Sequence, residues 1–259
     1  MKTKSIKCDF KNSRGDTLDA RIDMPADFNN NRNSCFIIYC HCFTCNKETI
    51  TSHRISRMLA ERGFAVLRFD FTGLGNSEGE FATTTFRSMQ DDLKSAIGFL
   101  TQNYQAPSFI VGHSFGGTTA LSVAQSSQDI KGVVTLASPF EPAHVLHHLD
   151  HSSISLLDND MPSSFEVAGQ LFDIDPEFVH DARSFNMKAV LAKLTKPVLI
   201  LNIENDDVVD EDNSRQIQQW HSGESVLVDI KNSDHMLTDR KSSEHVADLI
   251  SNWIRKKSG

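Results

Sequence analysis

The sequence predicts an α/β fold with a doubly wound, mostly parallel sheet. Short apolar runs that do not alternate recur along the chain, as expected for strands covered by helices on both faces. Segments with helical periodicity separate these runs, and one long insertion interrupts the alternation. A chain of 259 residues is long enough for one such sheet with a buried core on each face.

The predicted elements follow in chain order. A polar antiparallel hairpin comes first, because residues 6–10 and 17–24 alternate on either side of the turn-forming residues 12–16. The predicted strands of the main sheet are residues 35–40, 65–69, 108–111, 133–136, 198–201 and 226–230. The predicted helices are residues 51–62, 86–100, 117–124, 214–220 and 244–254. The hairpin and the single insertion exclude the regular repetition of an eightfold barrel.

The insertion is expected to form a cap. Residues 140–195 are rich in His and Asp and contain breaks at Pro162 and Pro176. Structureless loops of this length are uncommon inside a compact domain, so we expect a partly helical cap or lid over the site. Residues 1–139 and 196–259 would then form the core.

Composition excludes several classes of partner. The net charge is −8, from 34 acidic and 26 basic residues, and no basic stripe suggests nucleic acid. No apolar run approaches the roughly 18 residues of a membrane span, and residues 1–10 lack the apolar centre of a secretory signal. Five cysteines, four of them between residues 35 and 45, do not resemble a disulfide framework. We therefore expect a reduced, cytoplasmic protein with no membrane partner.

A candidate nucleophile lies between a predicted strand and a predicted helix, where residues 112–116 read Gly-His-Ser-Phe-Gly. A serine on so sharp a turn needs small residues two positions away on each side, where side chains would collide. Gly112 and Gly116 meet that need, and Gly117 lets the helix pack closely. The alternative, a phosphate-binding turn, lacks its Gly-x-Gly-x-x-Gly or Gly-Lys-Ser/Thr pattern here. The motif predicts Ser114 as the nucleophile.

A nucleophilic serine needs a base, and the base needs an orienting acid, in the chain order Ser, acid, His. His235 follows the last predicted strand, at the sheet edge where ligands bind, and is the favoured base. Asp206 and Asp207 follow the preceding strand and are the candidate acids. The backbone N–H groups of Phe115, after the nucleophile, and Phe43, after the strand 35–40, are the expected oxyanion donors.

These features resemble the α/β-hydrolase superfamily. The resemblance rests on the order of the triad, on His41-x-Phe43 and on residues 70–77, Asp-Phe-Thr-Gly-Leu-Gly-Asn-Ser. It implies the α/β-hydrolase fold and structural roles for Asp70 and Ser77. The family's acid-x-x-Val spacing favours Asp206, three residues before Val209, over Asp207.

The sequence resembles one bacterial subgroup of the superfamily more closely than the superfamily as a whole. Residues 41–45 and 68–75 resemble hydrolases that are found joined to, or beside, an OsmC-type peroxidase domain. This resemblance implies association with an OsmC-type peroxidase.

The clustered cysteines and histidines allow other interpretations. Neighbouring strand residues point to opposite faces, which disfavours a zinc site at Cys40, His41, Cys42 and Cys45. Packing is the default role of these cysteines, with a redox role for Cys42 and Cys45 as the alternative. In the insertion, His144, His147 and His148 have helical spacing and predict a solvated or substrate-facing helix.

The predicted reaction is hydrolysis of a small ester through an acyl-enzyme, with short acyl groups favoured and neither cofactor nor metal required. Thioesterase, peptidase-like, C–C bond hydrolase and acyltransferase activities use the same triad and stay as alternatives. Haloalkane and epoxide chemistry require an acidic nucleophile in this fold, which Ser114 is not. The alternative outside enzymes is a non-catalytic ligand-binding partner of an OsmC-type peroxidase.

Overall fold

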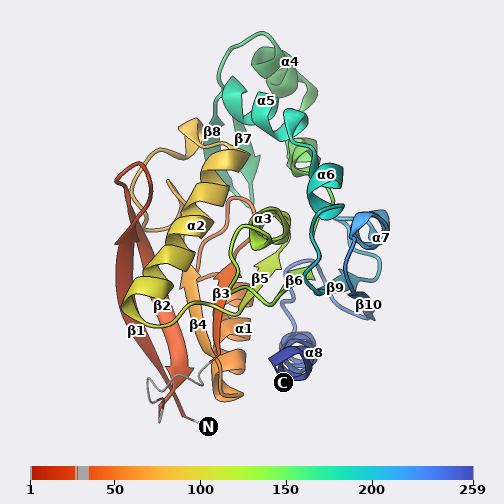
Figure 1. Ribbon diagram of the computed structural model, residues 1–259. Helices are drawn as coiled ribbons and strands as arrows, with labels where there is room; N and C mark the ends of the chain where they lie inside the picture. Colours follow the sequence, from red (N-terminus) through yellow and green to blue (C-terminus); the bar gives the residue numbers. More distant parts are fainter. Residues whose placement is uncertain (1, 27, 29–34, 259) are drawn as a thin grey trace.

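The computed structural model describes residues 2–26, 28 and 35–258, and its main sheet has eight strands. These are β1 (Thr3–Lys11), β2 (Thr17–Pro25), β3 (Phe36–Cys40), β4 (Ala65–Phe69), β5 (Phe109–His113), β6 (Gly132–Leu136), β9 (Val198–Ile203) and β10 (Ser225–Ile230). Their order across the sheet is β1-β2-β4-β3-β5-β6-β9-β10 (Figure 1). β1, β2 and β4 pair antiparallel, and every further pair is parallel. The prediction of a doubly wound, mostly parallel sheet with an opening hairpin is confirmed.

Helices cover both faces of this sheet and create two cores. The helices of the core are α1 (Ile50–Glu61), α2 (Phe86–Asn103), α3 (Phe115–Ala124), α7 (Glu211–Trp220) and α8 (Arg240–Ser258), with a short 3₁₀ turn η1 (Phe81–Thr83). Along β3, Ile38 and Cys40 join the cluster under α2 and α3. Ile37 and Tyr39 join the cluster under α1 and α8. Because both faces of the sheet are covered, β3, β4, β5, β6 and β9 are buried at every position rather than at alternate ones.

The segment between β6 and β9 forms a separate group of short elements. They are η2 (Pro142–His148), α4 (His151–Asp158), β7 (Ser163–Val167), β8 (Gln170–Ile174), α5 (Pro176–Ser184) and α6 (Met187–Leu191). Figure 1 shows α4, α5, β7 and β8 at the top, beyond the end of the main sheet. The antiparallel β7–β8 hairpin is not predicted by the sequence analysis. Its two-residue turn, Ala168-Gly169, has positive φ at both positions, and alanine is an uncommon residue in such a turn.

Within the described ranges, none of the helices is both long enough and apolar enough to cross a membrane.

Candidate active site

Ser114 lies in the sharp turn between β5 and α3. Its backbone has φ 52° and ψ −126°, a conformation that costs free energy in a residue other than glycine. A Cβ at Gly112 would lie 2.3 Å from the Gly116 carbonyl oxygen, and one at Gly116 would lie 2.4 Å from a carbonyl oxygen at the end of β3. A Cβ at Gly117 would lie 1.9 Å from Ser138 Oγ. The close packing that the sequence predicts around this turn is therefore present.

Asp206 and His235 form a hydrogen-bonded pair at the ends of the neighbouring strands β9 and β10. His235 Nδ1 lies 2.7 Å from Asp206 Oδ2, and Asp206 Oδ1 accepts from the N–H groups of Val208 and Val209 at 2.8 and 3.1 Å. Burial opposes the charge on Asp206, but His235 and the two N–H groups outweigh it and lower the pKa of the carboxyl. The alternative acid, Asp207, is exposed. The structure thus brings Asp206, rather than Asp207, to His235.

The pairing also determines the tautomer of His235. A carboxylate only accepts hydrogen bonds, so Nδ1 carries the proton and Nε2 is left as a base. Ser114 and His235 line the same cavity, and the hydrogen bonds of the described residues do not include one between Ser114 Oγ and His235 Nε2. In enzymes without substrate, catalytic hydrogen bonds are often long and tighten only in the complex.

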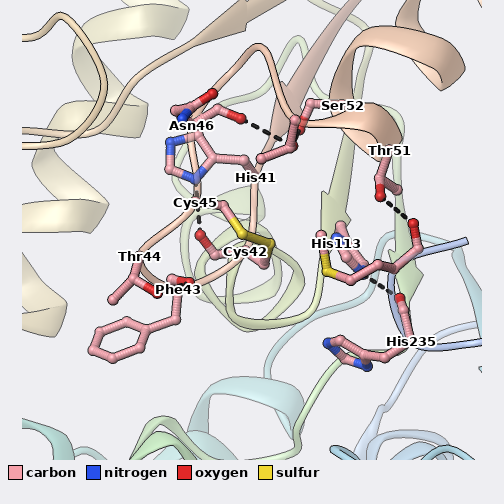
Figure 2. The surroundings of a disulfide bond; sticks show 12 residues. His41, Cys42, Phe43, Thr44, Cys45, Asn46, Thr51, Ser52, His113 and His235 are labelled. Carbon is pink, nitrogen blue, oxygen red and sulfur yellow. Dashed lines mark hydrogen bonds between the residues drawn. A yellow bond between two sulfur atoms is a disulfide. The ribbon is translucent and has the colours of Figure 1, made fainter. Parts of the chain in front are cut away.

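His113 supports the His235 loop and is not revealed by the sequence analysis. Its Nε2 lies 2.9 Å from the His235 carbonyl oxygen (Figure 2), so Nε2 carries the proton and donates it. Its Nδ1 is buried and has no partner among the described residues. Burial, followed by the nearby His235, lowers the pKa of His113 to about 3, so the ring is neutral. Its position inside the nucleophile motif, at the end of a buried strand, is the signal that could have revealed it.

From the other side, α1 holds the same loop. The Thr51 hydroxyl donates to the Met236 carbonyl, and Arg54 Nη1 donates to the Thr238 carbonyl at 2.9 Å. His235 is therefore supported from β5 and from α1.

The loop after β3 carries a disulfide between Cys42 and Cys45 (Figure 2). The expectation that all the cysteines stay reduced is therefore wrong for this pair. The loop makes a tight turn, in which the Cys45 N–H donates to the Cys42 carbonyl at 3.2 Å and Thr44 has φ 58°. This turn brings the two Cα atoms to 5.2 Å, a normal separation for a disulfide. An odd number of clustered cysteines argues against a framework of several cross-links, but it does not exclude a local pair within one turn. The remaining cysteines, Cys8, Cys35 and Cys40, are free thiols.

The N–H groups of Phe43 and Phe115 are both free. Phe115 is the first residue of α3, so its N–H has no acceptor within the helix. Neither N–H donates a hydrogen bond to any other described residue. The two segments touch, because the rings of Phe43 and Phe115 lie 5.3 Å apart between centroids. Two free donors therefore lie on adjacent segments beside Ser114.

Asp70 holds the loop after β3 through Lys47. Its carboxylate accepts from the Lys47 backbone N–H at 2.6 Å and from Lys47 Nζ at 2.7 Å. The Asn76 N–H also donates to this carboxylate at 2.9 Å, and the Ser77 hydroxyl donates to the Asp70 carbonyl at 2.6 Å. These contacts agree with the structural roles that the resemblance implies for Asp70 and Ser77.

A cavity of about 600 Å³ opens beside Ser114 and His235. Residues 42–46 form one wall, and the segment predicted to be a cap forms another through η2 and the β7–β8 hairpin. This volume suits a small-molecule ligand. In the parts of the chain that the structure describes, no three His, Cys, Asp or Glu residues are grouped to hold a metal ion.

Comparison with known proteins identifies the family. The model of the family described as "Serine aminopeptidase, S33" matches residues 37–170, just over half of the chain. The chain belongs to this family. The matched part of this S33-family hydrolase contains Ser114 and Phe43, whereas Asp206 and His235 lie beyond it.

Named relatives of this S33-family chain include esterases and a thioesterase. The esterase domain of a Rhodothermus marinus protein is 30% identical, with a TM-score of 0.77 and full coverage of both chains. The mitochondrial palmitoyl-protein thioesterase ABHD10 of Pongo abelii is 25% identical over 76% of this chain, which spans 65% of that relative's length. The thermostable monoacylglycerol lipase of Bacillus sp. (strain H-257) is 25% identical over 78% of this chain and 83% of the lipase. The protein is an α/β hydrolase.

Proposed function

We propose that this protein is a serine hydrolase that cleaves small carboxylic esters through an acyl-enzyme formed on Ser114. The observation that carries the proposal is the shared cavity of Ser114 and His235, with Asp206 bonded behind His235. The relatives named as an esterase domain and a lipase support an ester as the substrate.

The first half of the reaction acylates the enzyme. Ser114 Oγ attacks the ester carbonyl carbon while His235 Nε2 takes the hydroxyl proton. The N–H groups of Phe43 and Phe115 bind the oxyanion of the tetrahedral intermediate. The intermediate then breaks the bond to the alcohol oxygen, and the alcohol leaves with the proton from His235.

Water completes the cycle. His235 Nε2 takes a proton from water as its oxygen attacks the acyl carbon. The second tetrahedral intermediate expels Ser114 Oγ, which recovers the proton, and the carboxylic acid leaves. Asp206 keeps its negative charge throughout and stabilises the imidazolium. The residues named here supply every proton transfer, so the proposed cycle uses no cofactor.

A fluorophosphonate probe tests the proposal. Wild-type protein should become labelled on Ser114, and Ser114→Ala should lose both the label and the hydrolysis of p-nitrophenyl acetate and butyrate. Ser122→Ala is the matched control on α3, because the Ser122 hydroxyl donates to the Thr119 carbonyl and does not line the cavity. Equal labelling of wild type and Ser114→Ala would contradict the proposal, and no labelling of the wild type would favour a non-catalytic binding protein.

Thioester hydrolysis is the second candidate, because several relatives are named palmitoyl-protein thioesterases. The two reactions share every step except the leaving atom. Oxygen and sulfur esters of the same acyl group, compared by kcat/KM over chain lengths from acetyl to palmitoyl, separate them. A higher kcat/KM for the oxygen esters of short acids is expected. The opposite order, or a preference for palmitoyl, would favour the thioesterase. Aminoacyl p-nitroanilides test for peptidase-like activity. Alcohols added to the ester assay test for acyltransferase activity.

Association with an OsmC-type peroxidase, and a cytoplasmic location, stay predictions from the sequence. Co-purification with a tagged copy of the chain from its own cells tests the first, and cell fractionation tests the second.

A further inference from the structure

Two cap histidines face the cavity that holds Ser114. His144 and His148 line this cavity from η2, whereas their neighbour His147 lines a separate, outer cavity. The sequence alone left open whether this histidine-rich helix is solvated or faces the substrate. The structure shows that it divides its histidines between the two environments.

The other polar groups around the cavity are largely bonded within the protein. Thr44 donates to the Phe43 carbonyl, and Asn46 accepts from the Glu48 N–H. Further side chains that line the cavity and are already hydrogen-bonded are Thr49, Asp234 and Thr238. By contrast, neither imidazole of His144 or His148 has a hydrogen-bond partner among the described residues. The two rings are thus free to bind a ligand.

The remaining lining favours an apolar ligand around these rings. The apolar side chains that line the cavity include Pro139, Val145, Val167, Phe172 and Val209. Gln170 and Asp207 also line the cavity and lack a partner among the described residues. Both are exposed, as is His148, whereas His144 is half-buried. A hydrogen bond at the half-buried ring of His144 is worth more than one at an exposed group, and His148 lines the cavity from the same helix.

Charge narrows the chemistry of the ligand. Partial burial, followed by His147, lowers the pKa of His144, and partial burial, followed by His235, lowers the pKa of His148. Each ring is therefore largely neutral at pH 7, with one donor and one acceptor nitrogen. Asp207 and Asp234 also line the cavity, so a carboxylate on the substrate would meet like charges. A neutral hydroxyl group, which both donates and accepts, matches the rings best.

We propose that His144 and His148 select esters that carry a hydroxyl group away from the scissile bond. This inference rests on the proposed esterase function and names the class of its substrate. A hydroxyl on the acyl part and one on the alcohol part present the same chemistry to the rings, so the test includes both.

Two pairs of esters test the selection. They are methyl hexanoate with methyl 6-hydroxyhexanoate, and hexyl acetate with 6-hydroxyhexyl acetate. In at least one pair, kcat/KM should be about tenfold higher for the hydroxylated ester, mainly through KM. The double variant His144→Leu/His148→Leu should reduce that preference to less than about twofold. The double variant His144→Gln/His148→Gln keeps a donor and an acceptor at each position and should retain part of the preference for the hydroxylated ester.

His151→Gln is the control, because His151 lines the outer cavity and not the cavity that holds Ser114. The preference for the hydroxylated ester should persist in this variant. Equal kcat/KM within both pairs for the wild type, or an unchanged preference in the double Leu variant, would overturn the proposal. A higher kcat/KM for monomethyl adipate than for methyl 6-hydroxyhexanoate would overturn the hydroxyl class.

If neither these esters nor p-nitrophenyl acetate and butyrate are hydrolysed, the proposed function fails, and the selection is measured by binding instead. Hexane-1,6-diol should then protect Ser114 from the fluorophosphonate better than hexan-1-ol in wild type, but not in the double Leu variant. Equal protection in wild type would contradict the role of the two rings.

Discussion

The floor and the roof of the cavity are held in different ways. The floor consists of Ser114, His235 and Asp206 with the N–H groups of Phe43 and Phe115, and these residues follow the ends of strands β3, β5, β9 and β10. The roof consists of η2 and the β7–β8 hairpin, whose strands have exposed and buried positions interspersed. Displacing a floor residue disturbs the buried core, whereas many roof positions face water. The difference separates the reaction, which depends on the floor, from selectivity, which depends on the roof.

The largest expected effect is at the acid of the floor. Asp206→Asn should lower kcat by about 10³- to 10⁴-fold, because the amide no longer stabilises the imidazolium or the correct tautomer. Asp207→Asn is the neighbouring control and should change kcat by less than about twofold. Steady-state kinetics on p-nitrophenyl butyrate measures both. A large loss in Asp207→Asn alone would make Asp207 the acid.

Gly116→Ala tests the packing of the floor. The new Cβ would lie 2.4 Å from the carbonyl oxygens of Cys40 and His41, which are backbone atoms and yield little. We expect the free energy of unfolding to fall by about 3 kcal/mol. Gly98→Ala in α2 is the control, because nothing lies within 4 Å of its Cβ, and it should stabilise by about 0.5–1 kcal/mol. Urea denaturation compares them, and equal midpoints would show that the turn has room.

The disulfide is expected to matter less than the packed turn. Cys42→Ser/Cys45→Ser frees the turn that holds Phe43, so kcat should fall by about tenfold, less than the 10²–10³ lost with a whole oxyanion donor. The short loop implies a stability loss of about 2 kcal/mol. Dithiothreitol should lower the kcat of the wild type equally and leave the double variant unaffected. Thiol titration establishes that the disulfide has been reduced. If kcat is unchanged in the reduced protein, the turn keeps its conformation without the cross-link.

His113 should make the floor sensitive to acid. The folded pKa is about 3, below the ordinary value of 6.5, so in this interval the unfolded chain binds a proton that the native state does not. Stability should therefore fall as pH drops from about 6.5 towards 3, by at most about 1.4 kcal/mol per unit from this group. His113→Gln should flatten that slope, whereas the exposed His245→Gln should not. Urea midpoints at several pH values measure the slope, and equal slopes in wild type and His113→Gln would rule out this role.

The smallest expected effect is on the roof. Val167→Phe narrows the cavity from β7 and should lower the ratio of kcat/KM for octanoate over acetate esters by about fivefold. Leu171→Phe on the other strand of the hairpin is the control, because Leu171 is 67% exposed and does not line the cavity. A shift in this ratio with Leu171→Phe but not Val167→Phe would place the acyl group elsewhere.

Much of the core is predictable from sequence because its signals are local. All eight strands of the main sheet lie at predicted places, and β4 begins and ends at the predicted residues. Helix ends are less predictable: α8 extends four residues beyond each predicted end, through polar turns that carry no apolar periodicity. The β7–β8 hairpin was missed because its strands are half exposed and its turn contains an alanine.

The sequence by itself determined the turn at Ser114, because the requirement for Gly112 and Gly116 arises within a few residues of chain. Only the tertiary structure decided that Asp206 meets His235, that His113 supports the same loop, and that Cys42 and Cys45 are joined. It likewise decided which cap histidines face the cavity. These contacts depend on how strands and turns come together in space, and local patterns of residue type do not specify that arrangement.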